Sequence, residues 1–299
     1  MRAPLTVRVP LAGPFDLAAS LEPLRRSGDD LVDRWDGVRL LGTIGEVPYA
    51  ATPGGDLRRP WLDVTVEPAA GSDAVAAAVA ARFAPAPPSF AALCRADPVL
   101  GELDARLPGV RTVRRPDLLT ALIHCVSAQQ VNLVWAATTR RRLAEAFGRR
   151  LDVAGHAVFR HDAARLAAAT VAELRALQFT SAKAAFIIAA AGAVATGAVS
   201  LEELALLPDA EVVARLTALH GIGVWSAEWV LARTLGRPVV VTGDLGVRRA
   251  VGAAYLGEPL PSPAAVRRAT AHWGDAANAA QQLLLHAMAE GLLARPRRG

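Results

Sequence analysis

Hydrophobic and polar residues alternate at the start of the chain. Leu5, Val7 and Val9 alternate with Thr6 and Arg8, which predicts a half-buried strand. A helical pattern follows at Phe15, Leu17, Leu21 and Leu24, then four strand-like runs at Leu31–Trp35, Val38–Thr43, Val47–Ala51 and Trp61–Val66, and a second helical pattern at Ser72–Phe83. Asp36-Gly37, Gly45 and Pro53-Gly54-Gly55 separate the strand-like runs. This order predicts an antiparallel sheet with helices packed on one face.

The pattern breaks at Ala84-Pro85-Ala86-Pro87-Pro88, which reads as a linker. We predict an α+β protein with a sheet domain at residues 1–84, a linker at 85–88 and an all-α domain at 89–299. Beyond the linker, the only convincing strand-like run is Pro238–Thr242, and we expect about nine or ten helices. Their start signals are Asp117, Thr170, Ser181, Ser200, Asp209, Ser262 and Asp275. The arginine runs at 140–142 and 149–150 read as a solvated helix face, and Arg295–Arg298 as a solvated end.

Two glycines one residue apart, Gly221 and Gly223, lie between helical patterns and predict a helical hairpin over residues 209–234. The turn exposes backbone N–H groups at the positive end of the following helix dipole, which suits a phosphate. A lone carboxylate, Asp244, follows about twenty residues later in the segment 238–249. As Gly243-Asp244 before Leu245, it has the form of a helix N-cap.

Composition narrows the functional classes. The chain is 53% hydrophobic over 299 residues, enough for one large or two ordinary cores, and has no apolar run long enough for a membrane span. Its first residues lack a signal-peptide core, so we expect a cytoplasmic protein. Two distant cysteines, Cys94 and Cys125, exclude a four-cysteine metal site, and we predict no metal; Cys125 reads as a small buried residue.

The positive charge indicates a polyanionic partner only weakly, because the net charge is +5. Lys183 is the only lysine, so nearly all the positive side chains are arginines. Schiff-base catalysis would therefore have to use Lys183 or the N-terminal amine.

The hairpin followed by Gly243-Asp244 resembles the helix-hairpin-helix (HhH-GPD) DNA glycosylase superfamily, most closely its 3-methyladenine DNA glycosylase II branch. The resemblance spans most of residues 89–293, with supporting segments at Leu122–Asn132 and Phe179–Ala184. The amino-terminal sheet also fits that branch, whose extra domain is TBP-like. His220 departs from the family, because many relatives have proline there.

The resemblance implies roles for individual residues. It makes Asp244 the catalytic carboxylate, which stabilises the cationic sugar as the base leaves and orients water. Trp225 and Trp229 would line the pocket for a flipped base. The final helix lacks the aromatic residue that alkyl-base excisers often place there, and offers Gln281 and Gln282 instead. We assign Gln281 to the pocket, against simple surface exposure.

DNA contacts are implied as well. Gln130 would fill the gap left by the flipped nucleotide, and Gln129 would bond in the minor groove; a polar turn between helices is the alternative. The backbone of Gly221, Gly223 and Trp225 would bind phosphate, as would the side chains of Arg248 and Arg249. No cofactor is expected; a structural monovalent cation at the hairpin carbonyls, known in relatives, stays open.

The chemistry expected is monofunctional excision of damaged purines, alkylated purines first, from double-stranded DNA. Family members that also cut the strand carry a nucleophilic lysine just after the Gly-x-Gly turn, where this chain has Val224 and Trp225. The alternatives are a bifunctional 8-oxoguanine-type glycosylase/lyase and a non-catalytic DNA-binding or damage-sensing protein. We expect a monomer with no membrane association and no required protein partner.

Overall fold

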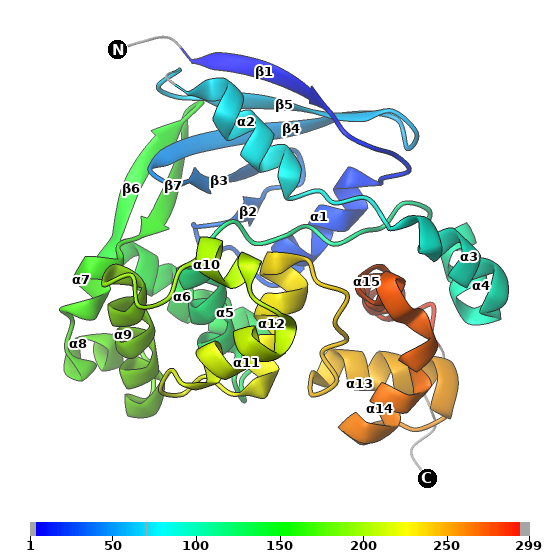
Figure 1. The fold of residues 1–299 in the computed structure, drawn as a ribbon. Coiled ribbons are helices and arrows are strands. Elements are labelled where there is room, and N and C mark those ends of the chain that lie inside the picture. The colour runs from blue at the N-terminus through cyan, green and yellow to red at the C-terminus, as the bar shows by residue number, and fades with distance from the viewer. Residues whose placement is uncertain (1–3, 70, 294–299) are drawn as a thin grey trace.

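The amino-terminal part of the chain forms a sheet of five antiparallel strands in the order β1-β5-β4-β3-β2 (Figure 1). The structure, a computed structural model, describes residues 4–69 and 71–293. The strands are β1 (Leu5–Pro10), β2 (Arg34–Trp35), β3 (Leu40–Ile44), β4 (Val47–Gly55) and β5 (Pro60–Val66), with helices α1 (Leu17–Arg26) and α2 (Ser72–Ala81). The predicted order of strand, helix, four strands and helix is confirmed.

Two strand boundaries differ from the prediction. Residues 31–33 form a loop, because Leu31 adopts φ +68° and the Asp30 carboxylate accepts a hydrogen bond from the Val32 N–H at 3.2 Å. The glycines at 54 and 55 belong to β4 and pair with β5. The turn instead falls at residues 56–59, where Asp56 accepts the N–H groups of Arg58 and Arg59.

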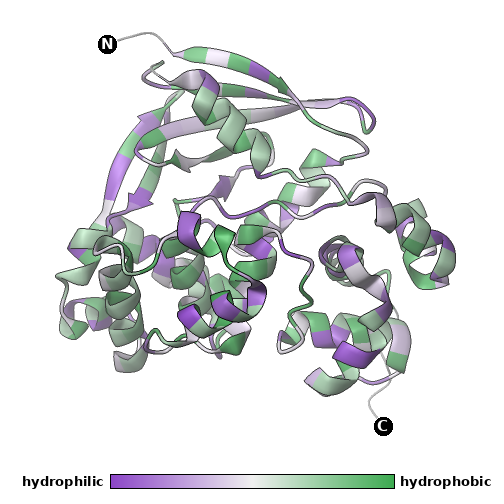
Figure 2. Cartoon of the chain, in the orientation of Figure 1, coloured by the Kyte–Doolittle hydropathy of each residue, from purple (hydrophilic) through white to green (hydrophobic). Residues whose placement is uncertain are grey.

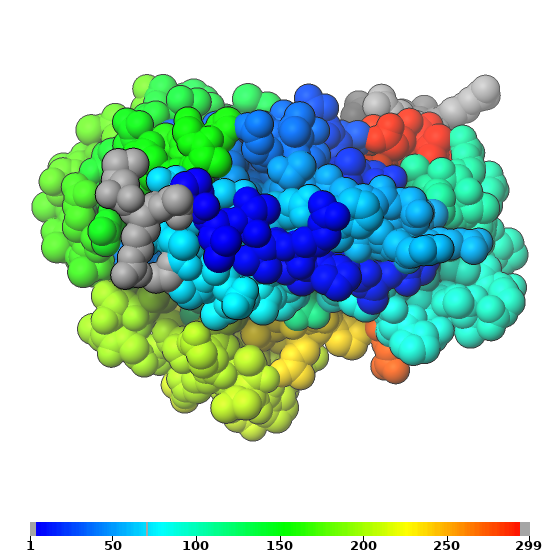
Figure 3. All heavy atoms as spheres, turned by 90° about the horizontal axis from the view of Figure 1, so that it is seen from above, coloured from blue at the N-terminus to red at the C-terminus, as the bar shows by residue number. Residues whose placement is uncertain are grey.

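The two faces of the sheet are covered by different elements. Tyr49, Leu62 and Val64 pack on one face with buried residues of both α1 and α2, so the prediction of helices on one face is confirmed. Leu41 and Ala50 point to the other face, because neighbouring strand residues alternate in direction. From above, β1 and α2 cover much of the visible face, and residues near 200–220 extend beyond its edge (Figure 3).

A hairpin of two strands, β6 (Gly148–Val153) and β7 (His156–His161), covers the second face and corrects the prediction of an all-helical second domain. Val153 and Val158 pack on Leu41 and Ala50. The connecting residues, Ala154 and Gly155, both have positive φ, the geometry of a tight hairpin turn; alanine gives little sign of it in a sequence. Arg149 and Arg150 are therefore exposed on a strand, not a helix, and β6 is largely hydrophilic in Figure 2.

The rest of the chain is helical, and Pro238–Thr242, the predicted strand, has no strand partner among the described residues. Residues 84–87 form neither helix nor strand, and the next helix begins at Pro88. The helices are α3 (Pro88–Ala96), α4 (Pro98–Arg106), α5 (Leu118–Ala128), α6 (Leu133–Phe147), α7 (Ala163–Ala167), α8 (Val171–Ala176), α9 (Ser181–Ala195), α10 (Leu201–Leu206), α11 (Asp209–Thr217), α12 (Val224–Val230), the π-helical η1 (Leu231–Leu235), α13 (Leu245–Val251), the π-helical η2 (Gly252–Leu256), α14 (Pro263–Ala269), the 3₁₀-helical η3 (Ala271–Ala276) and α15 (Ala277–Ala289). No helix within residues 4–69 and 71–293 is long and apolar enough to cross a membrane. The basic run at 295–298 lies outside the described residues.

Helix capping follows the sequence signals in most places. The side chains of Asp117, Thr170, Ser200 and Ser262 accept N–H groups at the starts of α5, α8, α10 and α14. Three signals were wrong by position. Thr180 caps α9 in place of Ser181, Pro208 precedes α11 in place of Asp209, and Asp275 lies inside η3.

The helices build two hydrophobic cores. One joins α5 and α9 with the hairpin helices α11 and α12, and the other joins α3 and α4 with α13 to α15. Helix α1 contributes Ser20, Pro23 and Leu24 to a cavity that residues of α5, α12 and α15 also line. The sheet region therefore supplies part of the surface between the two helical cores.

Buried ion pairs connect the loop after α1 to the helices. Asp33 forms ion pairs with Arg82 at 2.8 Å and with Arg115 at 2.7 Å. Asp30 forms an ion pair with Arg140 at 2.8 Å. Burial favours the neutral form of Asp30, but Arg140 and Arg115 outweigh it and lower its pKa. Arg140 is thus buried, so the prediction of a solvated arginine face is wrong at this residue.

We expect Asp33→Ala to lower the free energy of unfolding by about 3–5 kcal/mol, because it leaves buried guanidinium groups without their carboxylate. Urea denaturation would measure the loss. Asp152→Ala is the matched control, since Asp152 pairs with Arg150 in an exposed position and should cost under about 1 kcal/mol. Equal losses in the two variants would show that the buried cluster has no special weight.

Candidate active site

The hairpin turn joins α11 to α12 and depends on one glycine. Gly221 has φ +81°, and a Cβ there would lie 2.0 Å from the Phe186 ring. Gly223 has an ordinary φ of −98°, and a Cβ there would meet no atom within 4 Å. The structure gives the N–H groups of Gly223, Val224 and Trp225 no hydrogen-bond partner among the residues it describes. These donors remain available for an anion, as predicted for a phosphate.

Gln129 and Gln130 lie in the turn between α5 and α6, next to the hairpin turn. The Gln129 side chain reaches the Gly221 carbonyl at 3.5 Å, the outer limit of a hydrogen bond. Gln130 is exposed and has φ +55°, a left-handed conformation that costs a non-glycine residue roughly 1 kcal/mol. Exposed apolar side chains follow directly, at Val131, Leu133, Val134 and Trp135. The turn therefore presents a polar tip beside an apolar ridge, and the roles of both glutamines on DNA stay predictions.

Lys183 stabilises this turn through hydrogen bonds to its backbone. Its ammonium donates to the carbonyl oxygens of Ser127 and Gln129 at 2.9 and 2.7 Å, and burial lowers its pKa. Lys183 does not line the cavity that contains Asp244. The geometry gives the only lysine a structural task at the carboxyl end of α5.

Asp244 is fixed by two hydrogen bonds at the edge of a cavity of about 330 Å³. One oxygen accepts the Val247 N–H at 3.0 Å, so Asp244 caps α13 as predicted. The other accepts the Trp225 indole N–H at 3.3 Å. A capping carboxylate held by the hairpin helix can face the cavity without a change of rotamer.

Aromatic rings form one wall of this cavity. Trp225 and Trp229, both predicted in the pocket, line it from α12, one helical turn apart. The His124 ring stacks on Trp229 with centroids 4.9 Å apart and an interplanar angle of 21°. Burial, together with the charges of Arg140, Arg115 and Arg233, holds the pKa of His124 well below its usual value. A neutral, flat surface of this kind suits a planar ring.

Polar groups also line the cavity. Arg233 lies in η1, one turn beyond Trp229, and donates a hydrogen bond to the Gln282 side-chain oxygen. Burial lowers the pKa of Arg233 to about 10, with Asp244 opposing and Arg115 adding to the shift, so the guanidinium stays charged at neutral pH. Arg115 lines the cavity too, but it is paired with Asp33.

Gln281 is not in the cavity, which corrects its assignment. Its side chain is 1% exposed, and its oxygen accepts the Val241 N–H at 2.8 Å. Successive residues of a helix point about 100° apart, so Gln282 faces the cavity while Gln281 holds the segment before Asp244. Surface exposure, the alternative for Gln281, is also wrong.

The two arginines predicted to bind phosphate, Arg248 and Arg249, differ in how exposed they are. Arg248 is half-buried and donates to the Pro261 carbonyl at 2.8 Å. Arg249 is exposed on α13. Phosphate binding by either side chain stays a prediction.

No group of three or more metal-ligating side chains occurs in the part of the chain that the structure describes. Cys125 is fully buried, as predicted, and burial raises the pKa of its thiol. The monovalent cation at the hairpin carbonyls stays a prediction.

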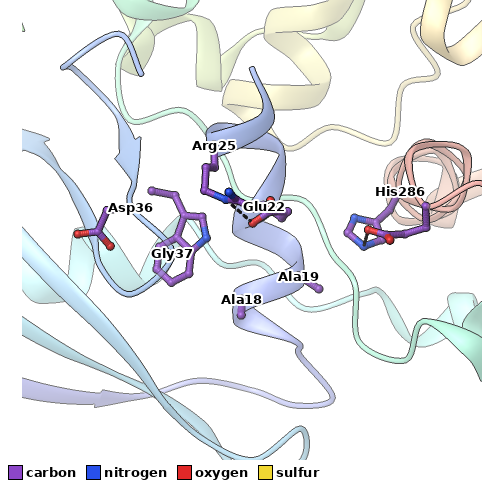
Figure 4. Close-up of a pocket in the computed structure, with 9 residues that line it drawn as sticks. Ala18, Ala19, Glu22, Arg25, Asp36, Gly37 and His286 are labelled. Carbon is purple, nitrogen blue, oxygen red and sulfur yellow. Dashed lines mark hydrogen bonds and ion pairs between the residues drawn. The ribbon is translucent and has the colours of Figure 1, made fainter. Parts of the chain in front are cut away.

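A second hollow, of about 380 Å³, lies between α1 and α15 (Figure 4). Four of its polar residues lie in pairs: Arg25 donates to Glu22 at 3.1 Å, and His286 lies 3.6 Å from Glu290. His286 borders both hollows. The first hollow combines the stacked rings of Trp229 and His124 with the helix-capping carboxylate of Asp244, so we take it as the candidate active site.

The sequence interpretation missed four groups of this site: His124, Arg115, Arg233 and the α1 residues. Arg233 could have been found, because residues 225, 229 and 233 repeat at helical spacing. The α1 residues could not, since nothing local connects them to residues a hundred positions away.

Two comparisons with known sequences match this region. A family model described as "HhH-GPD superfamily base excision DNA repair protein" matches residues 123–275. A "DNA-3-methyladenine glycosylase" of Bacillus subtilis (strain 168) is 32% identical over 156 residues, 52% of this chain and 52% of the relative. The match thus spans about half the length of that curated relative.

Solved structures show the same fold over nearly the whole chain. The "3-methyladenine dna-glycosylase from Archaeoglobus fulgidus" has a TM-score of 0.82 at 22% identity, covering 94% of this chain and 98% of that one. A Clostridium acetobutylicum 8-oxoguanine glycosylase/lyase in complex with dsDNA has a TM-score of 0.76 at 17% identity, covering 98% and 99%. The amino-terminal sheet is therefore part of a fold shared with both.

We expect Gly221→Ala to lower the free energy of unfolding by about 3 kcal/mol, because it combines a left-handed alanine with an overlap on Phe186. Chemical denaturation would measure the loss. Gly223→Ala is the control, and should cost no more than about 1 kcal/mol, since a Cβ there meets nothing within 4 Å. A larger cost at Gly223 than at Gly221 would contradict this account of the turn.

Acid should destabilise the fold partly through His124. Its folded-state pKa is depressed, so between pH 7.5 and 5.5 the unfolded state takes up a proton that the folded state does not, and stability falls. We expect His124→Phe, which retains a ring against Trp229, to lose about 1 kcal/mol less than the wild type over that interval. Urea midpoints at the two pH values would show the difference, and an identical loss in both proteins would refute the assignment.

Proposed function

The chain belongs to the HhH-GPD superfamily of base excision DNA repair proteins, and on that premise we propose that it is a monofunctional DNA glycosylase. In this proposal it flips a damaged purine out of double-stranded DNA and hydrolyses its bond to the sugar. Alkylated purines come first among its substrates. The observation that carries the proposal is Asp244, held by Val247 and Trp225 at the edge of an aromatic cavity.

The chemistry follows from what a nucleoside needs in order to lose its base. As the C1′–N bond breaks, the sugar becomes an oxocarbenium ion, and a carboxylate on its open face stabilises the positive charge and orients water. An alkylated purine is already cationic and leaves without an acid. One carboxylate is then sufficient, and Trp225 keeps Asp244 in position through its indole N–H.

Base binding is assigned to the stacked wall of Trp229 and His124. A purine extruded from the duplex would exchange stacking in DNA for stacking on these rings. Pre-formed stacking between the two rings supports this role, since neither ring has to move to present its face.

The DNA would be held by the two adjacent turns. The N–H groups at residues 223–225 suit a phosphate, and the exposed tip at Gln130 with its apolar ridge suits the gap left by the flipped nucleotide. Duplex DNA as partner is also supported by relatives of the same fold solved in complex with DNA. The monomeric state and the cytoplasmic location stay predictions from the sequence.

A glycosylase without strand cleavage is favoured over a glycosylase/lyase by the position of Lys183. A lyase needs an amine that attacks C1′, and the Lys183 ammonium is bonded to two carbonyl oxygens outside the cavity. The fold is shared with an 8-oxoguanine glycosylase/lyase, so 8-oxoguanine belongs in any substrate panel.

The test is a panel of duplex oligonucleotides, each with one purine lesion, followed by alkaline cleavage of abasic sites. We expect wild type to excise at least one alkylated purine, and Asp244→Asn to be slower by at least about 100-fold, because the variant lacks the charge that stabilises the sugar cation. The Asp244→Asn fold should survive, since asparagine also caps helices well.

Three outcomes would count against the proposal. No cleavage at any lesion by wild type would leave a DNA-binding protein without turnover. Equal rates in wild type and Asp244→Asn would remove Asp244 from the site. A borohydride-trapped adduct that disappears in Lys183→Arg would establish the lyase alternative.

A further inference from the structure

The cavity is lined by a half-buried cation, Arg233, that the chemistry described above does not use. Arg233 forms no ion pair with any carboxylate among residues 4–69 and 71–293, although the charge of Asp244 acts on its pKa. Its one side-chain hydrogen bond within that range goes to the oxygen of Gln282. The other N–H groups of the guanidinium are left for a group inside the cavity.

Arg233 is placed where the far edge of a bound base would lie. The indole of Trp225 bonds to Asp244. Along α12 and η1, Trp225 is followed by Trp229 and then by Arg233, each about one helical turn further on. A nucleotide with its sugar at Asp244 and its base on Trp229 and His124 would therefore direct its distal edge toward Arg233. The Gln282 oxygen is occupied by Arg233, so this end of the cavity offers hydrogen-bond donors.

Donors at this position match one class of purine edge. A 6-oxopurine presents two acceptors there, O6 and N7, whereas a 6-aminopurine presents one acceptor, N7, beside the N6 amino group, which is a donor. A half-buried guanidinium gains little from such a donor.

We propose that Arg233, positioned by Gln282, binds O6 and N7 of neutral 6-oxopurines such as hypoxanthine and stabilises them as leaving groups, a role that rests on the glycosylase function proposed above. A neutral purine leaves with the electron pair of its C1′–N9 bond, and the resulting negative charge spreads onto O6 and N7, where the guanidinium donates. The water oxygen bonds to C1′, one water proton passes by Asp244 to solvent, and the base takes up a proton from solvent. A cationic base such as 7-methylguanine becomes neutral as it leaves and does not need this help.

The experiment compares hypoxanthine with 7-methylguanine, which keeps O6 but has a methyl group on N7 and a positive charge, in duplexes of one sequence under single-turnover conditions. We expect wild type to excise both. In Arg233→Gln, hypoxanthine excision should fall at least about 100-fold and 7-methylguanine excision less than about 10-fold. Gln282→Leu should also lower the rate for hypoxanthine relative to the rate for 7-methylguanine, but by a smaller factor, because it removes the hydrogen-bond partner of Arg233 and keeps the charge.

Arg114→Gln is the matched control. Arg114 is also a partly buried guanidinium with an unpartnered Nε in the described chain, but it lines a different hollow. Its ratio of the two rates should equal that of wild type. The 7-methylguanine rate reports in every variant whether the protein is folded and active.

The outcomes separate this inference from the function on which it rests. If wild type excises neither lesion nor any other purine of the panel, the glycosylase proposal fails. If it excises 7-methylguanine but not hypoxanthine, or if Arg233→Gln slows both lesions equally, the role of Arg233 is overturned while the glycosylase function stands.

Discussion

The arrangement of the candidate site depends on the ion pairs that the buried carboxylate of Asp33 forms. Asp33 binds Arg82 at the end of α2 and Arg115 in the segment before α5, and so fastens the sheet region to the helices. Arg115 also donates its backbone N–H to the Arg233 carbonyl at 2.8 Å, which connects this ion cluster to the π-helical turn in the cavity. The cavity walls from α1, α5 and η1 therefore share one electrostatic anchor. This gives the amino-terminal sheet a physical role in the site: it holds α1 against the helical cores.

Asp244 is bonded to Trp225 near the start of α12, and Arg233 lies about two helical turns further along, in η1, with Trp229 between them. Such a separation of charge suits a reaction in which a bond between sugar and base divides its electrons unequally. Positive charge would develop beside the carboxylate and negative charge beside the guanidinium. Between them, Trp229 and His124 provide an apolar, uncharged surface, and the low local polarity strengthens both electrostatic effects.

Local sequence signals predicted much of the fold and the centre of the site. Alternation predicted β1, and the pair Gly221 and Gly223 with Asp244 predicted the turn and the capped carboxylate, because each depends on neighbours within one turn. Predictions failed where contacts between residues far apart in the sequence determine the local structure. The β6–β7 hairpin forms against Leu41 and Ala50 of another sheet, and Arg140 is buried because Asp30 reaches it from a loop more than a hundred residues earlier. Gln281 was misplaced for a smaller reason, since the sequence did not fix which of two adjacent helix positions faces the cavity.

Lys183, bonded to the carbonyls of Ser127 and Gln129, has a consequence for how this protein responds to its surroundings. As the only lysine, it leaves the remaining basic side chains to arginine, whose guanidinium keeps its proton well into the alkaline range. Amine-reactive reagents would therefore leave the surface charge nearly intact. Attraction to a polyanion would respond strongly to salt concentration but hardly to alkaline pH, unlike that of a lysine-rich protein of equal net charge.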